Sequence, residues 1–151
     1  MQLKETIHID APPHVVWEYV GSPDVWSLFH AKARNTRSVD TQGGRIGSRY
    51  EMQLSLGSKT APSTAEITDL QPGRLIQVKS TAEPKPGQKV SAMLTYELED
   101  AGTQTKVHER IDIDAPHINL FFRAVIWLVS RFGTPSGETS LMKLKRIIEE
   151  A

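Results

Sequence analysis

The chain of 151 residues contains no cysteine, which excludes disulfide bonds, thiolate catalysis and metal centres bound by cysteine. It also has no excess of either charge, because 18 Lys and Arg residues balance 18 Asp and Glu residues. A surface that holds polyphosphate needs a basic field, so we expect no nucleic acid partner. The length is typical of one domain, and we expect a single domain over residues 1–151.

Long apolar runs are absent as well. The most hydrophobic stretch, residues 118–132, is shorter than the roughly 20 residues that a membrane span needs, and Arg123 and Arg131 interrupt it. No apolar segment follows Met1, so we expect no secretory signal. These features predict a soluble protein of the cytoplasm without a transmembrane segment.

Apolar residues near the start recur with a period of two. Leu3, Ile7 and Ile9 alternate with polar residues, which predicts a strand whose odd-numbered side chains face inward. Similar alternation predicts further strands over 33–39, 46–56, 64–70, 75–81, 90–98 and 107–113. Pro72 and Gly73 are typical of a tight turn between two of these strands.

Helical spacing of apolar residues predicts two short helices over 13–20 and 25–29 and a long one over 118–148. Residues 133–137, which include glycine and proline, break or kink the long helix. A sheet of about seven antiparallel strands needs a cover for its apolar face, and among the expected elements the last helix alone is long enough. The order therefore predicts an α+β fold with the C-terminal helix packed on the sheet.

Several segments carry a resemblance to a known family. They are Ile7–Pro12, Val16–Val20, Pro23–Trp26, Leu70–Leu75 and Leu141–Glu149. With the order of elements, they resemble the START-like or SRPBCC superfamily, and within it the polyketide cyclase/dehydrase and lipid-transport branch. The resemblance covers essentially the whole chain. It implies a helix-grip fold, in which a curved antiparallel sheet wraps around the C-terminal helix and encloses a hydrophobic cavity.

Common catalytic and cofactor motifs do not match this chain. His108 begins a segment like the zinc motif HExxH, but the segment ends in Asp112 and falls on a predicted strand, so we expect no metal. His8 and His108 are expected on the outward face of their strands. Residues 43–47 lack the glycine spacing of a nucleotide-binding loop and are expected to form a hairpin turn. No G-x-S-x-G segment is present, and we expect no cofactor.

Two carboxylates fall on faces that should point inward. Glu5 shares its parity with Leu3 and Ile7, and Glu109 shares its parity with Val107. The helix-grip topology that the resemblance implies makes the first and last strands neighbours, which would bring Glu5 and Glu109 together. Two close carboxyl groups raise one pKa and suit acid–base catalysis. In the alternative interpretation, strand ends or a bulge expose these groups, or Arg37 or Arg49 pairs with one of them.

Large apolar and aromatic side chains on predicted inward faces are candidates for lining a cavity, although ordinary core packing explains most of the aromatic ones. The candidates are Trp26, Phe29, Tyr50, Met52, Leu54, Val90, Leu94, Tyr96, Phe121, Phe122 and Val125. A tyrosine hydroxyl among them supplies the sparse polar contact that orients an apolar ligand.

Three functions remain open at this point. The first is binding of a small hydrophobic ligand, such as a lipid, a polyketide or an aromatic metabolite, in an internal cavity. The second is an enzyme of the cyclase or dehydratase type, with Glu109 and Glu5 as acid–base groups together with Tyr50 or Tyr96. The third is a protein-interaction module, because Leu120 and Trp127 form a second apolar stripe on the long helix. Covering loops, self-association, a mobile lid or membrane contact would each explain that stripe.

Overall fold

The computed structural model describes residues 2–30, 33–39, 44–56, 59–85, 87–114 and 139–151. Its strands are β1 (Gln2–Ile9), β2 (Ala33–Ser38), β3 (Arg49–Leu56), β4 (Lys59–Gln71), β5 (Leu75–Lys85), β6 (Gln88–Ala101) and β7 (Gln104–Asp114). Its helices are α1 (Pro13–Val20), the 3₁₀ helix η1 (Pro23–Leu28) and α3 (Ser140–Glu149). The expected order of one strand, two short helices, further strands and a C-terminal helix is confirmed.

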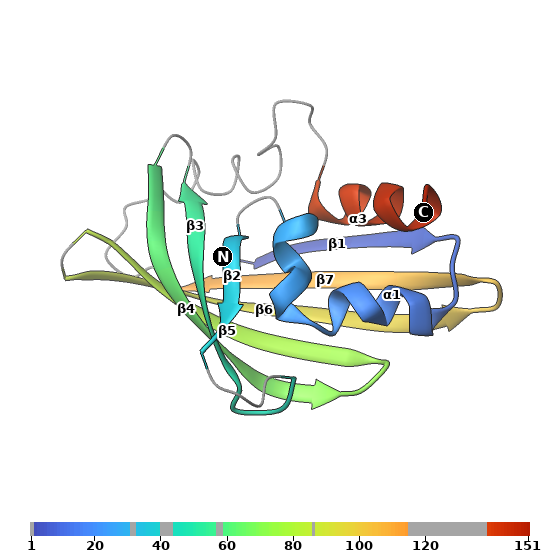
Figure 1. Cartoon of the computed structure of the whole chain (residues 1–151), viewed down its shortest axis with the longest axis horizontal. Helices are drawn as coiled ribbons and strands as arrows, with labels where there is room; N and C mark the ends of the chain where they lie inside the picture. The colour runs from blue at the N-terminus through green and yellow to red at the C-terminus, as the bar shows by residue number, and fades with distance from the viewer. Residues whose placement is uncertain (1, 31–32, 40–43, 57–58, 86, 115–138) are drawn as a thin grey trace.

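The strands form one seven-stranded sheet in the order β1-β7-β6-β5-β4-β3-β2. Every neighbouring pair is antiparallel, and the sheet is strongly curved (Figure 1). Consecutive strands from β2 to β7 pair through hairpins, while β1 pairs with β7 across nearly the whole chain. The sheet therefore places the first and last strands side by side, as the family resemblance implied.

The turn between β4 and β5 shows how local chemistry sets these hairpins. The Arg74 N–H donates to the Gln71 carbonyl oxygen at 2.9 Å, and Gly73 has a φ of +80°. Proline at the second turn position and a residue with positive φ at the third define a type II turn, which explains glycine at this place.

Strand β3 begins later than the sequence predicts. Ile46 was expected on its inward face, but the side chain is 60% exposed. The reason lies in the backbone of the next residue, because Gly47 has a φ of +90° and interrupts the extended conformation. Ordered alternation starts only after that point, with Ser48, Tyr50 and Met52 buried.

The concave face of the sheet and the short helices form the core. Val16 and Val20 of α1 are fully buried, and so are Trp26 of η1 and Phe29 just after it. The Trp26 Nε1–H donates to the Val20 carbonyl oxygen at 2.9 Å, which fixes η1 to the end of α1.

Helix α3 lies along β1 and buries Leu141, Leu144 and Ile148 (Figure 1). The Lys145 ammonium donates to the His8 carbonyl oxygen at 2.8 Å, and the Asp10 N–H donates to the Glu149 carboxylate at 2.8 Å. These contacts fix the helix at one edge of the sheet. The helix predicted over 118–132, with its two apolar stripes, lies outside the described residues. Among the helices that are described, none is long and apolar enough to cross a membrane.

A buried hydrogen bond at the start of β7 gives a test of this packing. The Thr105 hydroxyl is inaccessible to solvent and donates to the Ala11 carbonyl oxygen at 2.7 Å. We expect Thr105→Val to lower the free energy of unfolding by about 1–3 kcal/mol, because it leaves a buried carbonyl without its donor. Thr105→Ser keeps the hydroxyl and should retain most of the stability. Equal urea unfolding curves for the Val and Ser variants would contradict this role.

Candidate functional site

Three polar side chains stand in one row on the inner face of the sheet. In the strand register Glu5 of β1 lies opposite Glu109 of β7, and Glu109 lies opposite Tyr96 of β6. Glu109 shares the face of Val107, and Tyr96 is fully buried. The structure thus brings together the two carboxylates that the sequence singled out and adds a tyrosine hydroxyl beside them.

The inner end of this row lacks hydrogen bonds. Both Glu109 Oε2 and Tyr96 Oη are buried, and neither has a hydrogen-bond partner among the described residues. Burying such a group without a partner costs free energy, typically about 1–3 kcal/mol for each. The two side chains are close enough for each to affect the pKa of the other, but these two atoms form no hydrogen bond of good geometry, so a bound molecule can satisfy both.

The surroundings change the acidity of both groups. Burial raises the pKa of Glu109 to about 7; the nearby Tyr96 hydroxyl acts against this shift, and the charge of Glu5 adds to it. Burial also raises the pKa of Tyr96 well above its usual value, with Glu109 and Glu5 contributing in the same direction. Near neutral pH, Glu109 is thus able both to give and to take a proton, while Tyr96 remains a hydrogen-bond donor.

Thr139 holds the other end of the row. Its Oγ1 donates to Glu5 Oε1 at 2.7 Å, and this hydroxyl is also the N-cap of α3. Thr139 is not among the site residues predicted from the sequence, although a threonine directly before a helical pattern is a standard N-cap signal.

Of the two arginines considered as alternative partners, the side chain of Arg49 alone is among those that the structure describes. Arg49 pairs with Glu66 at 3.6 Å, and both side chains are largely exposed. The Arg37 side chain lies outside the described residues. In the part of the chain that the structure describes, neither Glu5 nor Glu109 forms an ion pair with an arginine.

Aromatic rings hold Tyr96 in place. The Trp26 ring meets Tyr96 edge to face with centroids 5.4 Å apart, and the Phe29 centroid lies 6.2 Å from Tyr96. His30 stacks on Trp26, with ring centroids 6.4 Å apart. The Tyr96 hydroxyl therefore has a fixed position, as a group that orients a ligand requires.

The other predicted lining residues are only partly described. Tyr50 and Met52 are buried, and Leu94 and Val90 are half-buried on the inward face of β6. The Tyr50 hydroxyl accepts a hydrogen bond from the Gly44 N–H at 3.0 Å, so it is already engaged. The side chains of Leu54, Phe121, Phe122 and Val125 lie outside the described residues.

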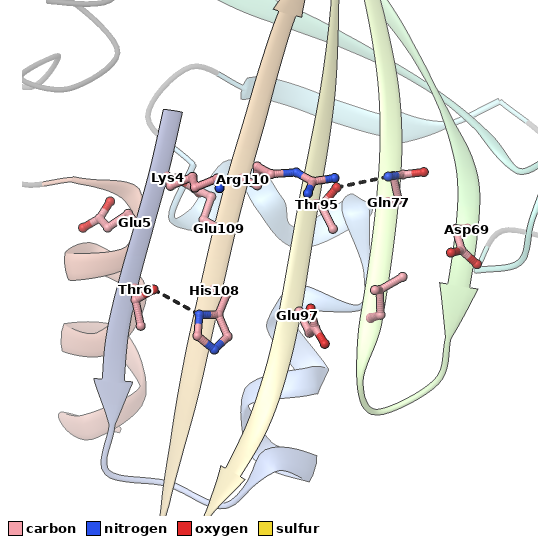
Figure 2. A pocket seen from close by; sticks show the side chains of 11 residues that line it. Lys4, Glu5, Thr6, Asp69, Gln77, Thr95, Glu97, His108, Glu109 and Arg110 are labelled. Atoms are coloured by element: carbon pink, nitrogen blue, oxygen red, sulfur yellow. Dashed lines mark hydrogen bonds between the residues drawn. The ribbon is translucent and has the colours of Figure 1, made fainter. Parts of the chain in front are cut away.

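A separate groove of about 330 Å³ lies on the opposite, outer face of the sheet (Figure 2). The outward-facing residues of its lining are Lys4, Thr6, Asp69, Leu75, Gln77, Thr95, Glu97, His108 and Arg110. Glu5 and Glu109 belong to the strands that floor this groove, but strand alternation places their side chains with the inner face.

Polar groups of the outer groove are largely paired with one another. The Thr6 hydroxyl lies 3.0 Å from His108 Nδ1, Glu99 Oε2 lies 3.1 Å from His108 Nε2, and Gln77 donates to Thr95 at 3.2 Å. His8 is exposed, so both histidines face outward as predicted. Because its groups are already satisfied, the outer groove is a weaker candidate than the inner row.

Comparison with known proteins agrees with this architecture. A family model described as polyketide cyclase / dehydrase and lipid transport matches residues 1–149. No curated protein matches this chain.

Solved structures share the fold at low sequence identity. The Zhui aromatase/cyclase from a Streptomyces species has a TM-score of 0.75 and 12% identity, covering 99% of this chain and 94% of its own. A START superfamily protein from Mycobacterium smegmatis has a TM-score of 0.71 and 8% identity, covering 99% and 97%. A conserved protein from Geobacillus kaustophilus has a TM-score of 0.72 and 14% identity, covering 99% and 96%.

The acidity of Glu109 gives a test with a defined sign. Its pKa of about 7 in the folded chain lies above the ordinary glutamate value of 4.5, so the folded state loses stability as pH rises from 4.5 to about 7. Glu109→Gln cannot ionise. We expect wild type and variant to be equally stable near pH 4, and the variant to be more stable by about 3 kcal/mol above pH 8.

The measurement is the free energy of urea unfolding between pH 4 and 9. Glu99→Gln is the matched control, because Glu99 faces outward on β6 and its hydrogen bond to His108 lowers its pKa. That control should show a difference of the opposite sign. Parallel curves for wild type and Glu109→Gln would mean that Glu109 is solvated.

Proposed function

The chain belongs to the polyketide cyclase/dehydrase and lipid-transport family of START-like proteins, and we propose that it binds a small, largely apolar molecule against the inner face of its sheet. The observation that carries this proposal is the pair of buried atoms, Glu109 Oε2 and Tyr96 Oη, without partners among the described residues. A ligand with one polar group at this point would satisfy both, and its apolar part would contact the surrounding core side chains.

The arrangement of polar and apolar groups around the row limits the chemical structure of such a ligand. One hydroxyl and one carboxyl group stand side by side, and aromatic rings and aliphatic side chains surround them. A molecule with a carbonyl or hydroxyl group on an apolar skeleton fits this distribution. Lipids, polyketides and aromatic metabolites all include such molecules, and the site does not select among them.

A catalytic role is the second candidate, and the acidity of Glu109 is what favours it. General acid–base catalysis is most effective when the pKa of the group lies near the working pH, and the pKa of Glu109 is about 7. In a dehydration, Glu109 would protonate the hydroxyl group that leaves as water, and Glu5 would take the proton from the adjacent carbon. Among the proteins of similar structure, the Streptomyces protein is an aromatase/cyclase.

The remaining functional predictions are not tested by the residues that the structure describes. Self-association through Leu120 and Trp127, and docking of another protein on the same helix, stay predictions. The expected location in the cytoplasm stays a prediction too. Sedimentation velocity on wild type and Trp127→Glu tests the first of these directly.

Ligand binding is tested with Nile red, a neutral dye that fluoresces in apolar surroundings. Leu94 is a half-buried residue on the inward face of β6, beside Tyr96 in the same alternating row. We expect saturable dye binding to wild type and at least about tenfold weaker binding to Leu94→Trp, because the larger ring fills the space. Thr95→Trp is the control, since Thr95 faces the outer groove. Equal loss in both variants, or in neither, would contradict the inner site.

The catalytic alternative is separated from simple binding by Glu109→Gln. If the chain is a dehydratase or cyclase, this variant should lose about 10²–10⁴-fold in kcat on a β-hydroxy ketone, because it cannot donate a proton. Its affinity for Nile red should change little. A variant that keeps full turnover rules out Glu109 as the acid and leaves the binding function standing alone.

A further inference from the structure

The hydroxyl group of Thr139 forms two hydrogen bonds. It accepts a hydrogen bond from the Met142 N–H at 3.2 Å, and it donates to Glu5 Oε1 at 2.7 Å. A hydroxyl has one proton to give. Because the backbone N–H of Met142 must be the donor in the first bond, the proton of Thr139 points toward Glu5.

The carboxylate that Thr139 holds acts electrostatically on the rest of the row. Glu5 stands directly opposite Glu109 in the register of β1 and β7. Its charge raises the pKa of both Glu109 and Tyr96. The position of Glu5 therefore sets part of the acidity of the two groups that would contact a ligand.

We propose that Thr139 is a positioning residue, which fixes the Glu5 carboxylate beside Glu109 so that Glu109 retains its proton for the bound molecule. The use of that proton rests on the proposed function. The positioning itself does not, because it is a property of the ligand-free chain.

This arrangement couples helix α3 to the polar row. Thr139 is the N-cap of α3, and the helix is anchored to β1 by the bond from Lys145 to the His8 carbonyl oxygen. A displacement of the first turn of α3 would carry the Thr139 hydroxyl away from Glu5. Thr139 is thus a contact through which the helix affects the protonation of Glu109.

The part of the chain that the structure describes places these other titratable and charged groups near the row. Glu5 reaches Glu109 from β1, and Tyr96 reaches it from β6. On α3, Lys145 is bonded to Glu149 at 2.7 Å, Lys143 lies one turn after Thr139, and Arg146 lies further along the helix. His30 stacks on Trp26, one ring removed from Tyr96.

The test follows the titration of Glu109 by ¹³C NMR of its side-chain carboxyl group in the ligand-free protein. Thr139→Val has nearly the same shape but neither accepts nor donates, and Thr139→Ser retains both bonds. We expect Thr139→Ser to titrate like wild type. We expect Thr139→Val to lower the pKa of Glu109 by about half a unit or more, because the Glu5 charge is no longer held beside it.

A double-mutant cycle separates positioning from helix capping. Glu5→Gln removes the charge and leaves the cap of α3 intact, so it must by itself lower the pKa of Glu109. In that background, Thr139→Val should produce no further shift. The same shift in both backgrounds would show that Thr139 acts through the helix alone, and this result overturns the proposal.

The proposal can still be tested if the Thr139→Val variant is too unstable to measure. Loss of an N-cap costs about 1 kcal/mol, and Glu5→Gln tests the electrostatic step without it. An unchanged pKa of Glu109 in Glu5→Gln also overturns the proposal. Failure of ligand binding appears separately, in the Nile red titration of wild type, so the two failures are distinguishable.

Discussion

The pairing of β1 with β7 is the constraint on which the site depends. It joins residues about a hundred positions apart and sets Glu5 against Glu109. Because side chains alternate between the two faces of a strand, a shift of one residue would move all of them to the other face. Register is therefore a condition of the site as much as of the fold.

Hydrophobic burial elsewhere on the same strands enforces that register. Ile9 on β1 and Val107 on β7 are fully buried, and each contributes about 1.5–3 kcal/mol by leaving water. Ionised Glu109 costs about 3 kcal/mol at neutral pH, which is the equivalent of its raised pKa. Two aliphatic side chains thus offset one buried carboxyl group, and the strand can keep Glu109 inside without slipping.

Much of the fold could be predicted from the sequence, because the physical signals are local and repeated. Alternation of period two located the strands, and Pro72 with Gly73 located a turn whose geometry the structure confirms. Strand ends were less accurate. Ile46 continues the alternating pattern but is exposed, because the extended backbone of β3 begins only after Gly47 with its positive φ. The alternation of apolar and polar side chains in the sequence does not reveal such a change in backbone conformation.

The site was predictable only in part, for a related reason. Parity placed Glu5 and Glu109 on inward faces, and the family topology placed their strands together. The hydrogen-bond partner of Glu5 is Thr139, which is distant in sequence and forms the N-cap of α3. Neither spacing nor periodicity relates a cap to a strand that lies more than a hundred residues earlier. Contacts of this kind depend on how α3 docks on β1, which only the structure shows.

The polar groups on the two faces of the sheet differ in their hydrogen bonding. Groups on the outer face contribute to stability, whereas those on the inner face are better explained by function. On the outer face His108 contacts both Thr6 and Glu99, and Gln77 contacts Thr95, so each group has its partner within the chain. On the inner face Glu109 and Tyr96 are buried in an apolar setting and incompletely satisfied. A leucine at position 109 would avoid that cost without disturbing the register. The chain instead retains an acid and a hydroxyl there, both buried without a partner among the described residues, which is the arrangement expected of a site that contacts a bound molecule.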